Sequence, residues 1–323
     1  MTKSLIQKIE KARNSKVITY VTGDRQPFIT KVADDIVPIF AKHLEEIGKQ
    51  DRISLFLYTR GGDMITPIRL IKLMRSYADE IEMIIPYRAH SAGTLISIGA
   101  DKIVMGRLGE LSPVDPSTGH PFNPENPANQ KQKMEISVED LNSYFLLAKE
   151  KAGVKDEQMI NVFEDLTAKI HPLSLGNAYR ATRMAKQITE KLLLMHFDKN
   201  NDKEKIENIV KEVTGDICIH GYPITRDEAD SLGLDVVEPD SELEKTMWEL
   251  YENYAEKMEL KNKFDPVAIL GGQEMTTFKY YGAFIQSADL TDGFVFNGKI
   301  RRIIKDNRAN IDVNVESSVW ENL

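Results

Sequence analysis

The sequence predicts an α/β protein in which helices cover a parallel sheet, and three observations lead to this fold class. Short apolar segments alternate with helical patterns from Val17 through Met105. These segments are apolar on both faces, which is typical of strands in a covered parallel sheet. The chain has 323 residues, 41% of them hydrophobic, which is enough for one large domain and a smaller addition.

The first elements are a strand, a helix and a second strand. We expect strands at 17–21 and 53–58, where β-branched and other apolar residues cluster. Between them, residues 36–47 carry apolar side chains at helical spacing, and Asp34 and Asp35 suit the start of this helix.

Gly61 and Gly62 end the second strand, and Asp63 is placed to cap the helix that follows. The apolar face of that helix comprises Ile65, Ile68, Leu70, Ile71, Met74 and Tyr77. The alternation continues with a strand at 81–86, a helix over 92–100 and a strand at 102–105.

The middle of the chain changes character. Residues 119–132 are rich in Pro, Asn, Gln and Gly, and we expect a long irregular loop there. Helical periodicity then predicts a helical section, with helices over 137–152, 156–169, 174–197 and 203–213.

The C-terminal part returns to strands. An α/β pattern resumes over 217–237, followed by an amphipathic helix over 241–261. Period-two patterns at 277–285 and 294–304 then predict a small β-rich C-terminal extension. We therefore expect a main domain over residues 1–262 and the extension over 263–323.

Composition narrows the function classes. A formal charge of -8 and the lack of a dominant basic face argue against a nucleic-acid partner and leave room only for a local basic patch. Cys218 is the single cysteine, which excludes an intrachain disulfide and favours a small buried residue in a reducing, cytoplasmic compartment. We find no signal peptide and no apolar run near the ~20 residues needed for a membrane span. The chain has no cluster of His and Cys residues at the spacing of zinc ligands and no nucleotide-triphosphate motif. We therefore expect no metal and no cofactor.

Two short motifs carry the chemistry. Ser91 follows an apolar strand and precedes the small residues Ala92 and Gly93, which permit a sharp turn and close approach of a substrate. The pair Gly61 and Gly62 can present a backbone N–H group that, with the N–H of Ala92, forms an oxyanion hole. The bland alternatives are an N-cap for Ser91 and an ordinary strand-to-helix turn for the glycines.

The motifs together resemble a known family. They are LYTRGGD at 57–63, HSAGT at 90–94, GADKIVM at 99–105 and LSPVDP at 111–116, with HGYPIT at 220–225 and EA at 228–229 before LGL at 232–234. Their order and spacing resemble the Clp-fold serine peptidases, in the branch called serine dehydrogenase proteinases, related to signal peptide peptidase A. The similarity covers roughly residues 30 to 240.

The resemblance implies a Clp/crotonase-like superhelix of ββα units, a homo-oligomer, and hydrolysis of peptide bonds by Ser91 without a cofactor. It also reveals a departure. Clp peptidases have a histidine about twenty-five residues after the serine, where this chain has Asp115.

The general base is therefore an open question in the sequence. By resemblance, the segment that contains His220 supplies the third member of the catalytic triad. If the histidine and the acidic residue have exchanged positions relative to Clp peptidases, the triad is Ser91, His220 and Asp115. Asp115 equally fits a turn carboxylate before proline. The alternative is a Ser–Lys dyad in which Lys133, or its neighbour Lys131, is desolvated enough to act.

Among the other five histidines, His120 could reach the site but nothing in the sequence fixes it there, and the remaining four fit structural roles better. His90 adjoins the serine, His43 and His196 lie in helical patterns, His120 lies in the proline-rich loop, and His171 suits a helix start.

Three functions follow from these observations. The first is an intracellular serine endopeptidase that binds an extended peptide near Gly61, Gly62 and 111–113 by backbone pairing. The second is a crotonase-type acyl-CoA enzyme in which Ser91 is idle. The third is a catalytically inactive assembly or scaffold protein that uses the C-terminal extension for contacts.

Overall fold

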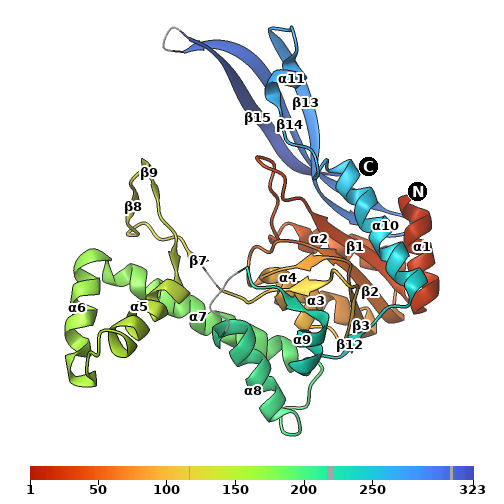
Figure 1. The fold of residues 1–323 in the computed structure, drawn as a ribbon. Coiled ribbons are helices and arrows are strands. Elements are labelled where there is room, and N and C mark those ends of the chain that lie inside the picture. Colours follow the sequence, from red (N-terminus) through yellow and green to blue (C-terminus); the bar gives the residue numbers. More distant parts are fainter. Residues whose placement is uncertain (116, 217–220, 306–307) are drawn as a thin grey trace. The chain divides into compact units, whose positions relative to one another are not determined.

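The computed structural model describes residues 1–115, 117–216, 221–305 and 308–323, and the chain divides into two compact units. Unit 1 comprises Met1–Leu111 and Pro223–Leu323, and unit 2 comprises Ser112–Tyr222. In Figure 1, unit 2 is the part coloured from yellow to green. The mixed α/β class expected from the sequence is confirmed by the sheet of unit 1.

That sheet has eight strands in the order β12-β5-β3-β2-β1-β13-β14-β15. The strands are β1 (Lys16–Thr22), β2 (Gln50–Tyr58), β3 (Ala78–Ile85), β5 (Lys102–Met105), β12 (Val236–Val237), β13 (Met275–Gln286), β14 (Thr291–Lys305) and β15 (Arg308–Asn322). The strands from β12 to β1 are parallel, and β13, β14 and β15 add to β1 in antiparallel fashion.

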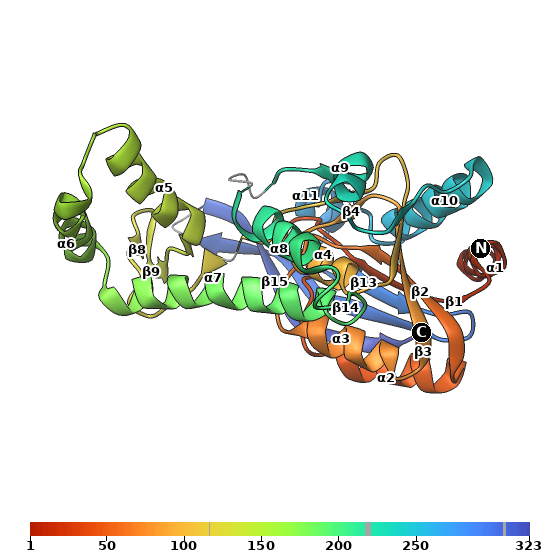
Figure 2. The ribbon, with the colours of Figure 1, turned by 90° about the horizontal axis from the view of Figure 1, so that it is seen from below.

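Helices cover both faces of the parallel strands. Along β1, Val17 and Val21 join a core with α1 (Thr2–Arg13) and α10 (Ser241–Lys257). Tyr20, which points to the opposite face because side chains alternate along a strand, packs edge-on against Phe40 of α2 (Ile36–Ile47). α3 (Thr66–Arg75) lies beside α2 (Figure 2).

A second, three-stranded sheet lies at the end of β2. It contains β4 (Arg88–Ala89), β6 (Glu110–Leu111) and β11 (Ile224–Thr225) in the order β11-β6-β4. A parallel bridge between Thr59 and Ala89 joins it to the residue that follows β2. The sheet is flanked in sequence by α4 (Ala92–Ile98) and α9 (Arg226–Ser231). It therefore brings the segment before α4 next to the end of the main sheet.

Strand β13 contains a bulge with a structural role. The ladder between β13 and β14 shifts between Tyr281 and Ala283, so Gly282 is the extra residue. Its carbonyl oxygen accepts hydrogen bonds from the N–H of Gly23, at 2.6 Å, and from the hydroxyl of Thr30. The bulge thus fixes the loop between β1 and Val32. A short helix, α11 (Pro266–Leu270), precedes this strand.

Unit 2 consists of helices and short strands. The strands are β7 (Ser117–Thr118), β8 (Glu125–Asn126), β9 (Asn129–Lys133) and β10 (Ile136–Ser137), and the helices are α5 (Val138–Glu150), α6 (Met159–Lys169), α7 (Pro172–Leu193) and α8 (Lys203–Lys211). A 3-10 turn, Asp156–Gln158, precedes α6, and a π-helical turn, Glu212–Asp216, follows α8. A small core of Ile136, Val138 and Ala178 joins β10, α5 and α7.

Two expectations need correction. The irregular loop expected over 119–132 contains most of the β8–β9 hairpin, because its Asn and Pro residues form a tight turn in which Asn126 Oδ1 accepts the N–H of Ala128 at 2.9 Å. Ile65 was expected on the buried face of its helix but is 42% exposed, since α3 begins only at Thr66.

Two other expectations are not tested by the structure. The start of the α/β pattern expected over 217–237, with Cys218, lies outside the described residues. The domain boundary at residue 262 stays a prediction.

Candidate functional site

Ser91 lies in a strained turn between β4 and α4. Its backbone angles are φ 51° and ψ -108°, a combination that non-glycine residues rarely adopt. These angles are near those of the first central residue of a type II′ turn, and the carbonyl of His90 accepts the N–H of Gly93 at 2.7 Å to close that turn. Serine nucleophiles that follow a strand and precede a helix occupy strained turns of this kind.

The first glycine of the pair, Gly61, contacts this turn directly. A Cβ atom placed on Gly61 would lie 2.8 Å from the carbonyl oxygen of His90, 2.8 Å from Cβ of Ser91 and 3.1 Å from the N atom of Ala92. With φ at 100°, Gly61 also has a conformation that favours glycine. The structure therefore brings the predicted residues Gly61, Ser91 and Ala92 together.

The next residue, Gly62, lies against Val32. Val32 donates its N–H to the carbonyl of Gly61 at 2.9 Å and accepts the N–H of Asp63 at 2.8 Å. In a trans peptide the N–H points opposite to the C=O, so the N–H of Gly62 points away from Val32. A Cβ on Gly62 would meet the carbonyl oxygen of Val32 at 2.1 Å, which requires glycine here.

The two glycine N–H groups differ in their partners. Gly61 donates its N–H to the side-chain oxygen of Thr59 at 3.1 Å. Of the pair, Gly62 is thus the better candidate for an oxyanion donor. Ala92 is the first residue of α4, where N–H groups have no partner within the helix.

Charged groups surround the neighbouring His90. Its Nε2 atom lies 3.0 Å from Oε1 of Glu110, which also accepts from Nε of Arg88 at 3.0 Å. Burial lowers the pKa of His90, and Arg60 and Arg88 lower it further, although Glu110 opposes them. The ring is therefore neutral near pH 7, and we assign the proton to Nε2 because a carboxylate accepts it.

Unit 2 holds two of the remaining predicted residues. Asp115 is half-buried, and its Oδ2 atom accepts from the hydroxyl of Ser137 at 3.4 Å. Lys133 lies on β9 with its side chain 42% exposed, and its ammonium pairs with Glu125 at 3.2 Å. An exposed, paired lysine lacks the desolvation that a basic lysine requires, which weakens the dyad alternative. His220 lies outside the described residues.

Three other histidines have structural partners. His171 accepts the N–H of Leu173 at 3.2 Å and caps α7, as its place before Pro172 suggests. His120 packs against the ring of Phe122. His43, which we expected to be an ordinary helix residue, is fully buried between Ser287 and Asp292.

Sequence reasoning missed three contributors to this region. They are Thr59, Val32 and Glu110. Thr59 belongs to the same short motif as the glycines and was within reach of the sequence. Val32 and Glu110 carried no signal, because their roles depend on pairings across the fold.

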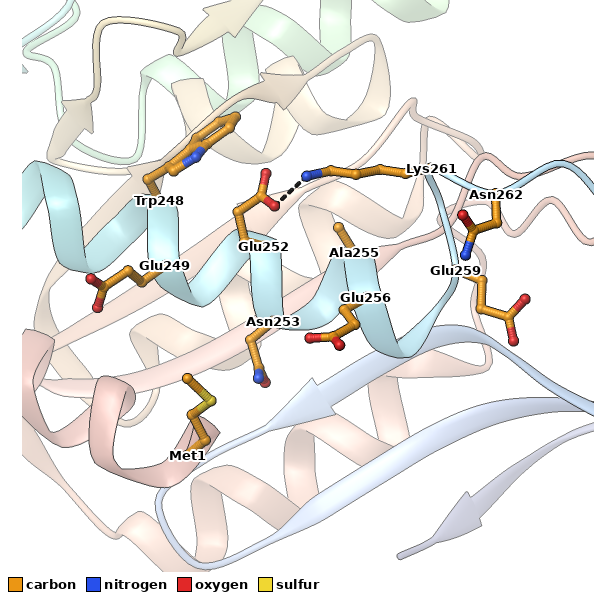
Figure 3. Close-up of a pocket in the computed structure, with 10 residues that line it drawn as sticks. All are labelled: Met1, Trp248, Glu249, Glu252, Asn253, Ala255, Glu256, Glu259, Lys261 and Asn262. Carbon is orange, nitrogen blue, oxygen red and sulfur yellow. Dashed lines mark hydrogen bonds and ion pairs between the residues drawn. The ribbon is translucent and has the colours of Figure 1, made fainter.

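One groove of unit 1 lies elsewhere. It has a volume of about 450 Å³ beside α10 and the N-terminus, and its carboxylates belong to Glu249, Glu252, Glu256 and Glu259. Figure 3 shows Glu252 paired with Lys261. Ser91 and the glycines are not among its lining residues, so this groove gives no information on the serine site.

Two features are missing from the described parts of the chain. Among the described residues, no group of three or more His, Cys, Asp or Glu side chains could hold a metal ion. Among the helices so described, none has the length and hydropathy to cross a membrane.

Comparison with known proteins gives one family match and two similar proteins. A family model described as ClpP-like SDH-type serine proteinase matches residues 1–170. The uncharacterized protein MJ0137 of Methanocaldococcus jannaschii is 28% identical over 253 residues, which cover 76% of this chain and 77% of that protein. The uncharacterized protein MJ1495 of the same organism is 27% identical over 267 residues, covering 79% and 77%.

Proposed function

Because this chain belongs to the family of ClpP-like SDH-type serine proteinases, we propose that it is a serine endopeptidase with Ser91 as its nucleophile. The observation that carries the proposal is the contact between two turns, the strained turn of Ser91 and the glycine turn of Gly61. A rigid serine beside outward-pointing backbone N–H groups is the arrangement that acyl transfer needs.

The proposed reaction begins when the hydroxyl of Ser91 attacks the carbonyl carbon of a peptide bond. The carbonyl oxygen becomes an oxyanion, which accepts hydrogen bonds from the N–H groups of Gly62 and Ala92. The leaving amine takes a proton, and an acyl ester remains on Ser91. Water then hydrolyses this ester through a second oxyanion in the same place.

The general base in the proposal is His220, oriented by Asp115. A neutral imidazole accepts the proton of Ser91 and passes it to the leaving amine. The exposed and paired state of Lys133 favours this set over the dyad. We further propose a Clp/crotonase-like arrangement of ββα units and a homo-oligomer, as in the resemblance noted above.

Covalent labelling with a fluorophosphonate probe, read by intact mass, tests the proposal. We expect one adduct on the wild-type chain, none on Ser91→Ala, and slow labelling of His220→Ala and Asp115→Asn. Lys133→Ala is the matched control and should label at the wild-type rate. A folded wild-type chain without an adduct would contradict the proposal and favour an assembly role. An adduct lost in Lys133→Ala would assign the dyad instead.

A further inference from the structure

Thr59 lies between the two turns of the candidate site. It follows β2 directly and its side chain is fully buried. Its main chain binds the serine turn, because its N–H donates to the carbonyl of Arg88 at 2.9 Å and its carbonyl accepts the N–H of His90 at 3.0 Å. These bonds fix the start of the turn that contains Ser91.

The side chain of Thr59 binds the glycine turn. Its hydroxyl oxygen accepts the N–H of Gly61 at 3.1 Å and the hydroxyl of Thr22 at 2.8 Å. The N–H of Gly61 is thereby directed into the protein. Its carbonyl is held on the other side by Val32 at 2.9 Å. With both of its polar groups fixed, Gly61 leaves the following peptide, which carries the N–H of Gly62, little rotational freedom.

We propose that Thr59 is a positioning residue, whose hydroxyl binds the N–H of Gly61 so that the N–H of Gly62 faces the oxyanion. This inference rests on the proposed function. Thr59 then positions both halves of the oxyanion hole. Its side chain positions the N–H of Gly62, and its main chain positions the Ser91 turn that leads to Ala92. The hydroxyl oxygen, rather than the size of the side chain, carries the first of these roles.

Three variants separate this role from plain stability. Thr59→Val keeps the shape but removes the acceptor, whereas Thr59→Ser keeps the acceptor. Thr22→Val is the matched control, because Thr22 is equally buried and its loss leaves the bond between Thr59 and Gly61 in place. All three are compared with wild type in hydrolysis of a fluorogenic peptide library and in the rate of phosphonylation.

We expect Thr59→Val to lower kcat and the phosphonylation rate by about 100-fold, with KM changed less than about threefold, since losing one oxyanion donor has an effect of this size. Thr59→Ser should restore most of the rate, and Thr22→Val should keep it. Equal losses in Thr59→Val and Thr22→Val would overturn the proposal, as would a wild-type rate in Thr59→Val.

A second measurement does not depend on activity. In protein labelled with ¹⁵N-glycine, the amide of Gly61 should exchange slowly in wild type and Thr59→Ser, and quickly in folded Thr59→Val. Unchanged exchange in Thr59→Val would overturn the hydrogen-bonding role. A wild-type chain that lacks the phosphonate adduct but shows this exchange pattern would instead refute the peptidase function alone.

Discussion

Ser91 combines a nucleophilic side chain with a backbone conformation that serine rarely adopts. A positive φ at a residue with a Cβ costs on the order of 1–3 kcal/mol and persists only where the surroundings enforce it. Here the His90–Gly93 turn and the contact with Gly61 enforce it. Ser91 is half-buried in this turn, so the strain lies at the residue that we propose as the nucleophile.

This strain gives a prediction for residue 91. Ser91→Gly should be more stable than Ser91→Ala by about 1 kcal/mol, because glycine adopts a positive φ without the steric cost. Both variants lack the proposed nucleophile and should be inactive. Urea unfolding followed by circular dichroism measures the difference. Equal stabilities would show that the turn is not strained.

A second prediction concerns His43 on α2. Its Nδ1 lies 2.9 Å from the hydroxyl of Ser287 and its Nε2 lies 3.0 Å from Asp292, which also pairs with Lys42. Burial lowers the pKa of His43 below its ordinary value of about 6.5, although Asp292 opposes this shift. The unfolded chain therefore binds a proton at this site more readily than the folded chain.

The sign of the effect follows from that difference. The contribution of His43 to the free energy of unfolding should be constant above about pH 6.5 and should fall as the pH decreases from there towards the folded-state pKa. Urea titrations between pH 5 and pH 8 on wild type and His43→Gln measure this. The variant should lose that part of the pH dependence, and parallel curves for the two proteins would contradict the assignment.

At the scale of elements, α1 is attached to the sheet by a buried ion pair. Arg13 binds Glu82 of β3 through two guanidinium nitrogens, and Glu82, which is fully buried, also accepts from Ser54 at 2.9 Å. Side-chain hydrogen bonding to Glu82 raises the pKa of Arg13. The pair therefore fixes the helix but buries a carboxylate that depends on its partner.

Removing one partner of the ion pair between Arg13 and Glu82 should lower the free energy of unfolding more than removing both partners. We expect Arg13→Met to lower the free energy of unfolding by about 3 kcal/mol, because Glu82 is left buried and unpaired. Arg13→Met combined with Glu82→Leu should recover most of this loss. A double-mutant cycle by urea unfolding measures the coupling, and additive losses would show that the two side chains act independently.

The elements also show what the sequence could predict. Strands and helices with a clear period were found, including β5 over the expected residues. We expected no element over α1, although Leu5, Ile6 and Ile9 are spaced for one buried helical face. The alternation of Ile311, Val313 and Val315 indicates β15 but was not used. These signals were local and readable, whereas the tiny strands β4 and β6 exist only through their partners in the three-stranded sheet.

At the scale of the whole molecule, α5 and α6 expose large apolar side chains. No residue of α6, which the structure describes in full, is buried, although the helix is amphipathic. Leu147 on α5 and Ile160 and Phe163 on α6 are 57%, 58% and 47% exposed. An isolated helix of this length is marginal in water, so a covering surface would stabilise it. We expect this surface in the proposed homo-oligomer.

Light scattering coupled to size-exclusion chromatography tests this expectation. The wild-type protein should have a mass that is a multiple of one chain, and Leu147→Lys combined with Phe163→Lys should reduce it. Ile304→Lys is the control, because Ile304 is 83% exposed on β14 and lies in unit 1. A wild-type mass of one chain would contradict the oligomer, and equal effects of both changes would exclude α5 and α6 as the interface.

The candidate site was predictable to the extent that it is local. Ser91, Gly61 and Ala92 were predicted from two short motifs, and they lie in contact. The choice between Gly61 and Gly62 was not predictable, because it depends on which N–H the hydroxyl of Thr59 binds. The assignments of His220 and Asp115 stay predictions. A base that is distant in sequence leaves no spacing rule by which it could be recognised.

The bulge at Gly282 has a consequence for the order in which the chain is made. The loop that leads to Val32 is held by a carbonyl 252 residues further along the chain, and Val32 in turn holds the glycine turn. While the ribosome is still synthesising the C-terminal strands, this support is missing. The glycine turn therefore receives its full support only after β13 has been released. The proposed activity, which needs this turn, would therefore arise only after residue 282 has been added to the chain.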